Sequence, residues 1–117
     1  MKRSIPARPV SEPEARYWAD RGTIYDPREG QVLSYAGHRP PGVFVLLAGR
    51  LRLVREGGGR RRRAGDIVAP AVVGEGVLSA ESTCPLTVEA GSGVRVAFVP
   101  AARWRDARAE GGYSRGV

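Results

Sequence analysis

Residues 43–53 read VFVLLAGRLRL, and this stretch contains two short β-rich segments, Val43 to Ala48 and Leu51 to Arg55. Gly49 lies between them, where the chain has to turn sharply and positive φ favours glycine. The same pattern continues on both sides of this stretch. From Thr23 to Val99, glycine or proline interrupts short β-rich segments every few residues. That spacing is typical of an all-β sandwich or barrel.

Six further segments complete the series: Thr23 to Tyr25, Gln31 to Tyr35, Ile67 to Val68, Ala71 to Val73, Leu86 to Ala90 and Val94 to Val99. Apolar and polar residues alternate most clearly in the last two segments, which is the period of a strand with one buried face. Only a short glycine-containing turn, residues 91–93, separates these two segments. We therefore expect them to pair as a hairpin.

A helix is expected at each end of the β-rich region. Ser11 followed by Pro13 and Glu14 is a helix start, with a capping serine and a proline in the first turn, and Gly22 stops the helix. This helix should cover about residues 12–21. The second helix follows Pro100 and should cover about residues 101–110 before a pair of glycines breaks it.

Composition restricts the class of protein. The chain has 117 residues and a net charge of +7, which suits one globular domain. With Cys84 as its only cysteine and His38 as its only histidine, the chain has no residues for an internal disulfide or a cysteine-based zinc site. No apolar run approaches the roughly 18 residues of a membrane helix. We expect a cytoplasmic protein with no cofactor, no metal and no membrane partner.

The glycines and the segments between them are similar, in order and spacing, to those of a known family. The matching pieces are PREGQVL at 27–33, AGH at 36–38, VFVLLAGRLRL at 43–53, GD at 65–66, TVEA at 87–90 and VRVAFVP at 94–100. Together they resemble the cyclic-nucleotide-binding β-roll of the catabolite activator protein and the anaerobic regulators. The resemblance implies an antiparallel jelly roll, a cupin-like double-stranded β-helix, over about residues 23–100 of a single domain spanning residues 1–117.

The resemblance also implies a ligand-binding cassette. In ligand-binding members, a Gly-Glu pair holds the ribose and a Pro-Arg-Ala-x-Thr-Val run supplies an arginine to the cyclic phosphate. Here Gly74 and Glu75 precede Thr87 at the family spacing, but Cys84 occupies the place of the arginine. A buried phosphate without a cationic partner is costly. Gly74, Glu75, Cys84 and Thr87 are therefore the candidate ligand residues of a site that lacks its phosphate arginine.

A second alignment places the cassette differently. The segment GDIVAPAVV at 65–73 resembles family members that carry Ala-Pro-Ala in place of Gly-Glu and are not usually regarded as cyclic-nucleotide receptors. Under this alignment residues 74–83 form an extended surface loop, and Glu75 has no special role. Under either alignment the phosphate arginine is missing, so a nucleotide site would need a substitute phosphate contact, for which Arg50 and Arg95 are candidates.

Other reactive residues give weaker signals. His38 should lie in an exposed turn, and no metal set or nucleophilic constellation can be assembled, so no catalytic residue is expected. Cys84 is expected to be a small loop or core residue, with a redox-sensing thiol as the alternative. A run of four arginines, Arg60, Arg61, Arg62 and Arg63, follows three glycines and should form a basic strand edge at a hairpin tip. Their alternation leaves two on each face, a candidate contact for weak, nonspecific nucleic-acid binding or for an acidic partner.

The function that follows is a non-catalytic regulatory or sensor module, related to the effector domain of catabolite-activator-type transcription regulators. The missing arginine predicts little or no cyclic AMP binding. The candidate partners are a small-molecule effector, a protein partner and a second copy of the chain. The alternatives are a stand-alone protein-interaction domain without a small ligand and a cyclic-nucleotide binder with a substituted phosphate contact.

Overall fold

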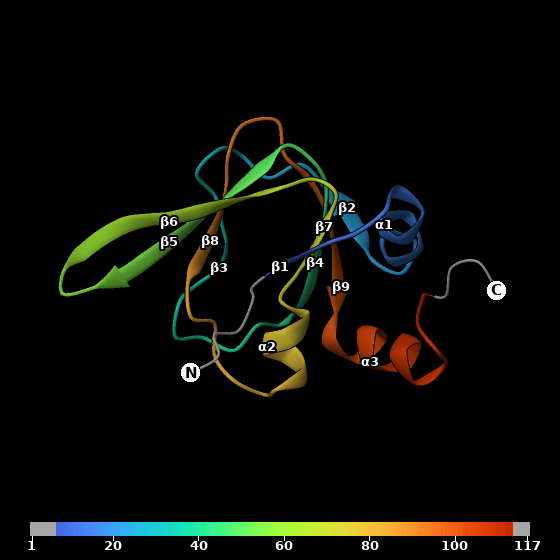
Figure 1. Cartoon of the computed structure of the whole chain (residues 1–117). Helices are drawn as coiled ribbons and strands as arrows, with labels where there is room; N and C mark the ends of the chain where they lie inside the picture. Colours follow the sequence, from blue (N-terminus) through green and yellow to red (C-terminus); the bar gives the residue numbers. More distant parts are fainter. Residues whose placement is uncertain (1–6, 114–117) are drawn as a thin grey trace.

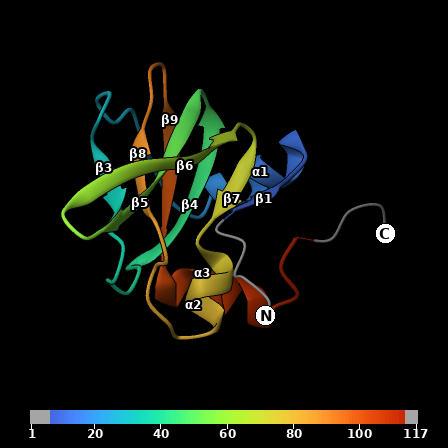
Figure 2. The same cartoon turned by 60° about the vertical axis from the view of Figure 1, so that its left-hand side comes forward.

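The computed structural model describes residues 7–113, in which two sheets and three helices are arranged as a roll (Figures 1 and 2). The strands are β1 (Ala7–Pro9), β2 (Thr23–Tyr25), β3 (Val32–Ser34), β4 (Gly42–Ala48), β5 (Arg50–Gly57), β6 (Arg60–Val68), β7 (Ala71–Val73), β8 (Thr87–Ala90) and β9 (Arg95–Pro100). The helices are α1 (Glu12–Ala19), α2 (Glu75–Ser79) and α3 (Ala101–Ala109). None of these helices is long and apolar enough to cross a membrane.

The two sheets have the orders β1-β7-β4-β9-β2 and β3-β8-β5-β6, and every paired neighbour is antiparallel. Consecutive strands change sheets repeatedly, which is the topology of a jelly roll. The fold class predicted from the sequence, an antiparallel β-roll with a short helix near each end, is confirmed.

Strand β4 is the centre of the larger sheet and is buried on both faces. It pairs with β7 on one side and β9 on the other. Val43 and Val45 belong to the apolar cluster that the helices cover, whereas Phe44 and Leu46 belong to the cluster between the two sheets. This double burial explains why residues 43–47 are apolar without interruption.

The helices α1 and α3 cover the face of the larger sheet that points away from the smaller sheet. Trp18 of α1 and Trp104 of α3 are both almost fully buried, and their ring centroids lie 4.0 Å apart. The two rings pack over the sheet beside Val43, Val45 and other small apolar residues. The larger sheet is therefore the middle layer of three.

The expected hairpin between the last two strands is wrong. Strand β8 pairs with β3 and β5 in the smaller sheet, whereas β9 pairs with β4 and β2 in the larger one. The turn at residues 91–93 therefore carries the chain from one sheet to the other. Both strands have alternating apolar residues, and placing them in opposite sheets lets Val88 and Val96 bury their side chains in the same inter-sheet core. Local alternation identifies each strand but not its partner.

Two elements were not expected from the sequence. Strand β1 pairs along the outer edge of β7, with Ala7 opposite Val73 and Pro9 opposite Ala71. Helix α2 follows β7 immediately, so the extended loop that the second alignment assigns to residues 74–83 is wrong. Both elements flank β7, and together they form the site described below.

Gly49 and Gly30 offer a matched test of the turns. Both have positive φ, +83° and +87°, but a Cβ on Gly49 would lie 2.6 Å from the Gly93 carbonyl oxygen, whereas one on Gly30 would meet nothing within 4 Å. We expect Gly30→Ala to cost about 1–2 kcal/mol of stability through backbone strain alone, and Gly49→Ala to cost about 1–3 kcal/mol more because of the clash. Urea unfolding of both variants measures the difference, and equal losses would contradict it.

Candidate functional site

Glu75 is held at the start of α2 by the turn that precedes it. Gly74 has φ 96°, which ends β7 and places Glu75 as the first residue of the helix. Strand β1, paired to the edge of β7, brings Arg8 alongside. The Arg8 guanidinium donates through Nε to one oxygen of Glu75 and through Nη2 to the other, at 3.3 Å. Both oxygens of Glu75 therefore already accept hydrogen bonds.

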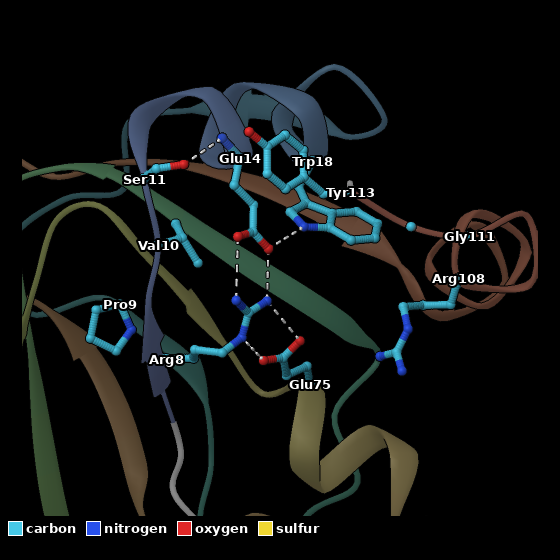
Figure 3. A pocket seen from close by; sticks show the side chains of 11 residues that line it. Arg8, Pro9, Val10, Ser11, Glu14, Trp18, Glu75, Arg108, Gly111 and Tyr113 are labelled. Carbon is cyan, nitrogen blue, oxygen red and sulfur yellow. Dashed lines mark hydrogen bonds and ion pairs between the residues drawn. The ribbon is translucent and has the colours of Figure 1, made fainter. Parts of the chain in front are cut away.

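Arg8 also binds a second carboxylate. Its Nη2 lies 2.9 Å and its Nη1 3.3 Å from the two oxygens of Glu14 on α1, so the guanidinium lies between two glutamates (Figure 3). The indole nitrogen of Trp18 donates to the same Glu14 at 3.1 Å. Hydrogen bonds to Glu75, then to Glu14, raise the pKa of Arg8 above its already high value. Arg8 therefore ties β1, α1 and α2 together.

These residues line an open cavity of about 560 Å³. Its principal side chains come from β1, both neighbouring helices, α3 and the segment after it: Arg8, Glu14, Trp18, Glu75, Arg108 and Tyr113. Figure 3 shows the Tyr113 ring beside Trp18, with Arg108 on the far side of the space from Arg8. Two arginines and two glutamates leave the lining near neutrality, so the cavity itself has no strong preference for an anion.

The hydrogen-bond partners of Cys84 belong to the turn at residues 34–38. Cys84 is 7% exposed, its backbone N–H donates to the His38 carbonyl at 2.9 Å, and its own carbonyl accepts from Gly37 at 2.8 Å. Burial raises the pKa of the Cys84 thiol, and a hydrogen bond with Ser34 opposes that shift in part. Cys84 is therefore a core residue of the loop before β8, packed against the turn at residues 34–38, and its environment does not favour a thiolate.

Thr87 is buried against the same turn. Its side chain is 1% exposed, and its hydroxyl oxygen accepts from the Ala36 backbone N–H at 3.0 Å. The four residues that the sequence groups as ligand contacts thus have different partners. Gly74 and Glu75 lie beside Arg8, and Cys84 and Thr87 lie against the turn at 34–38, where His38 is exposed as expected.

Both candidate substitutes for the phosphate arginine, Arg50 and Arg95, have acidic partners. Arg50 pairs with Asp66 at 3.2 Å, and Arg95 donates to both oxygens of Asp26 at 2.8 and 3.1 Å. Both arginine side chains are 58% exposed. The hydrogen bond from Arg95 lowers the pKa of Asp26. These contacts place both cations on the surface of the roll, engaged with carboxylates.

The arginine run forms the first part of β6. Arg61 and Arg63 pair with acidic residues of the same sheet, and all four arginines of the run are exposed. Within residues 7–113, no three histidine, cysteine, aspartate or glutamate side chains gather closely enough to hold a metal ion.

Sequence reasoning missed Arg8. Glu14 was identified only as part of a helix cap, and the Glu14 N–H does donate to Ser11 at 3.1 Å. Its carboxylate, however, accepts from Arg8 and Trp18. The sequence carries no signal for this, because Arg8 and Glu75 are 67 positions apart and meet only when β1 joins β7.

Comparison with known proteins agrees with the fold. The sequence profile of the cyclic nucleotide-binding domain matches residues 27–110. This chain belongs to that family. No curated protein is similar enough in sequence to count as a relative.

Solved structures share the fold of this family member. A transcriptional regulator from Thermotoga maritima superposes with a TM-score of 0.72 at 20% identity, over 81% of this chain and 75% of that one. A cyclic nucleotide-binding-like protein from Brucella abortus gives 0.69 at 23% identity, over 80% and 82%. The catabolite activator protein of Thermus thermophilus gives 0.70 at 16% identity, over 86% of this chain but 48% of that one. The chain thus spans about half the length of the activator that it matches.

The environment of Cys84 predicts slow thiol chemistry. Because the thiol is buried and its pKa is raised, we expect the native protein to react with a disulfide reagent such as DTNB far more slowly than the same protein in denaturing urea. The rate at neutral pH should rise with urea as the protein unfolds. If the thiol of the native protein reacted as fast as that of the unfolded protein, Cys84 would not be buried. The alternative, a redox-sensing thiol, would then be favoured.

Proposed function

We propose that this chain is a non-catalytic regulatory module, related to the effector domains of catabolite-activator-type regulators, and that its roll does not hold cyclic AMP. The observation that carries the proposal is the buried, uncharged Cys84 at the position where the resemblance requires the phosphate arginine. A cyclic phosphate entering the roll would lose its hydration without gaining a cation there, which is unfavourable.

The state of Glu75 supports the same conclusion. In ligand-binding relatives the matching glutamate accepts from the ribose hydroxyl. Here both of its oxygens accept from Arg8, so a ribose hydroxyl would compete with a charge-assisted, two-pronged contact. A hydrogen bond from a neutral hydroxyl is weaker than such a contact. The cassette therefore has its phosphate contact missing and its ribose contact occupied.

A stand-alone protein-interaction domain is the second candidate function. It is favoured by a different observation, the basic hairpin formed by β5 and β6, which lies outside the ligand cassette. We also propose that this hairpin can contact nucleic acid weakly and without sequence preference through four arginines, Arg60, Arg61, Arg62 and Arg63. The affinity of such a contact would fall steeply with salt.

Calorimetric titration with cyclic AMP tests the proposal. We expect no measurable heat of binding for the wild type and a gain for Cys84→Arg. We expect a larger gain when Arg8→Gln is added to free the carboxylate of Glu75. Each charge-assisted hydrogen bond restored to the phosphate is worth about 1.5–3 kcal/mol, or about ten- to a hundredfold in affinity.

Cys84→Met is the matched control, because it adds a long side chain without a charge and should bind no better than the wild type. Because position 84 is buried, thermal unfolding of each variant checks that the fold survives, and Arg8→Gln alone shows the effect of freeing Glu75. Tight binding of cyclic AMP by the wild type would overturn the proposal.

A further inference from the structure

The hairpin of β5 and β6 extends beyond the rest of its sheet. Residues 51–54 of β5 pair with β6 on one side and β8 on the other, but residues 55–57 pair only with β6. Figure 1 shows the two strands projecting away from the body of the roll. The end of the hairpin, residues 55–62, therefore presents two faces that no other strand of the described chain covers.

The outer face of this hairpin is neutralised by acidic residues. Arg61 lies 3.2 Å from a carboxylate oxygen of Glu56 and 2.8 Å from one of Glu89. Arg63 lies 2.7 Å from Asp66. The hydrogen bond from Arg61 lowers the pKa of Glu89, as expected for a paired carboxylate. On this face each arginine of the run has an acidic partner.

The opposite face carries arginines with no such partners. Leu51 and Leu53 point into the inter-sheet core, so Arg55, two positions further along β5, is on the same side. Arg62 is directly opposite Arg55, and Arg60 is two positions from Arg62. All three are exposed, and no acidic side chain within residues 7–113 forms an ion pair with them. We call these three residues the unpaired arginine face.

Protection of a strand edge does not account for this face. Charged residues on an edge strand discourage unwanted pairing, and Arg60 and Arg62 on β6 would serve that purpose. Arg55 would serve the same purpose on β5, whose residues 55–57 pair only with β6, but edge protection does not require Arg55 to lie directly opposite Arg62. Placing it directly opposite Arg62 is unfavourable, because like charges at paired positions repel. Binding a negatively charged group would offset that repulsion.

The backbone of β6 adds a second feature. β6 is the last strand of the four-stranded sheet and is nine residues long, and no strand of the described chain pairs with its other side. Its outward N–H and C=O groups are available to an added strand. A ligand that fits the hairpin should therefore combine an extended peptide backbone with negative charge on one side.

We propose that β6 binds an extended acidic segment of a partner protein by strand addition, with alternate carboxylates of that segment facing Arg60 and Arg62 and the charge of Arg55 behind them. Side chains two apart on an added strand lie on one face, so alternate acids all meet the unpaired arginine face. Guanidinium and carboxylate form paired, charge-assisted hydrogen bonds. A nucleic acid is disfavoured, because β5 and β6 contain no aromatic residue for stacking and a phosphate backbone cannot pair with a strand edge.

This inference goes beyond the regulatory role proposed above, because it concerns another surface and does not depend on what the roll holds. The test uses the whole chain and a fluorescent peptide of about ten residues that alternates glutamate and threonine. A peptide of the same composition with its glutamates in one block has the same charge but cannot place every carboxylate on one face. A DNA duplex is the third probe, and all titrations are run at physiological ionic strength, about 0.15 M.

The test variant is Arg55→Gln, Arg60→Gln, Arg62→Gln, and the matched control is Arg28→Gln, Arg103→Gln, Arg105→Gln. The control removes the same charge from exposed arginines outside the hairpin. We expect the alternating peptide to bind the wild type and the control equally, and the test variant about tenfold more weakly or worse. Alternate peptide nitrogens can be N-methylated in two ways, beginning at an odd or at an even residue. Only one of these two sets of N–H groups would face β6, and methylation of that set should weaken binding to a similar extent.

Several results would overturn the inference. Equal binding of the alternating and block peptides would reduce the contact to net charge. Equal losses in the two arginine variants would do the same. Tighter binding of the duplex, lost in the test variant only, would make the hairpin a nucleic-acid surface. Absence of binding by every probe would leave the arginines as edge protection alone.

Discussion

The two-sided burial of β4 is the constraint on which the structure depends. Val43 and Val45 pack under Trp18 and Trp104, while Phe44 and Leu46 pack toward the smaller sheet. A strand buried on both faces needs a hydrogen-bonded neighbour on each side and an apolar layer above and below. β7 and β9 are the hydrogen-bonded neighbours of β4. The helices and the smaller sheet supply the two apolar layers. The three-layer arrangement follows from this one apolar stretch.

The candidate site is a consequence of how that sheet ends. β7 is short, and β1 extends its sheet by one strand at the open side. The added strand carries Arg8, which meets a glutamate from α1 and a glutamate from α2. One cation therefore fixes three elements, and one of its two carboxylates is Glu75, the residue that the resemblance matches to a ribose-binding glutamate.

The distribution of charge distinguishes two surfaces of the roll. Around the cassette, arginines and glutamates balance. On the hairpin, the outer face is balanced, whereas its other face carries three cations with no acidic partner in the described chain. A net charge of +7 says nothing about which face carries the excess, because that depends on strand register. The cassette and the hairpin are therefore two separate surfaces made of different residues.

The sequence by itself determined the β-roll, the two flanking helices and the family, because these rest on local signals: glycines at turns, a serine cap and the spacing of short strands. It also predicted that Cys84 stands where ligand-binding relatives have the phosphate arginine. Only the tertiary structure decided which strands pair, since alternation in β8 and β9 suits any antiparallel neighbour. It alone brought Arg8 to Glu75 and placed Arg55 opposite Arg62. Contacts between residues far apart in the chain depend on strand topology and register, and no short stretch of sequence determines either of them.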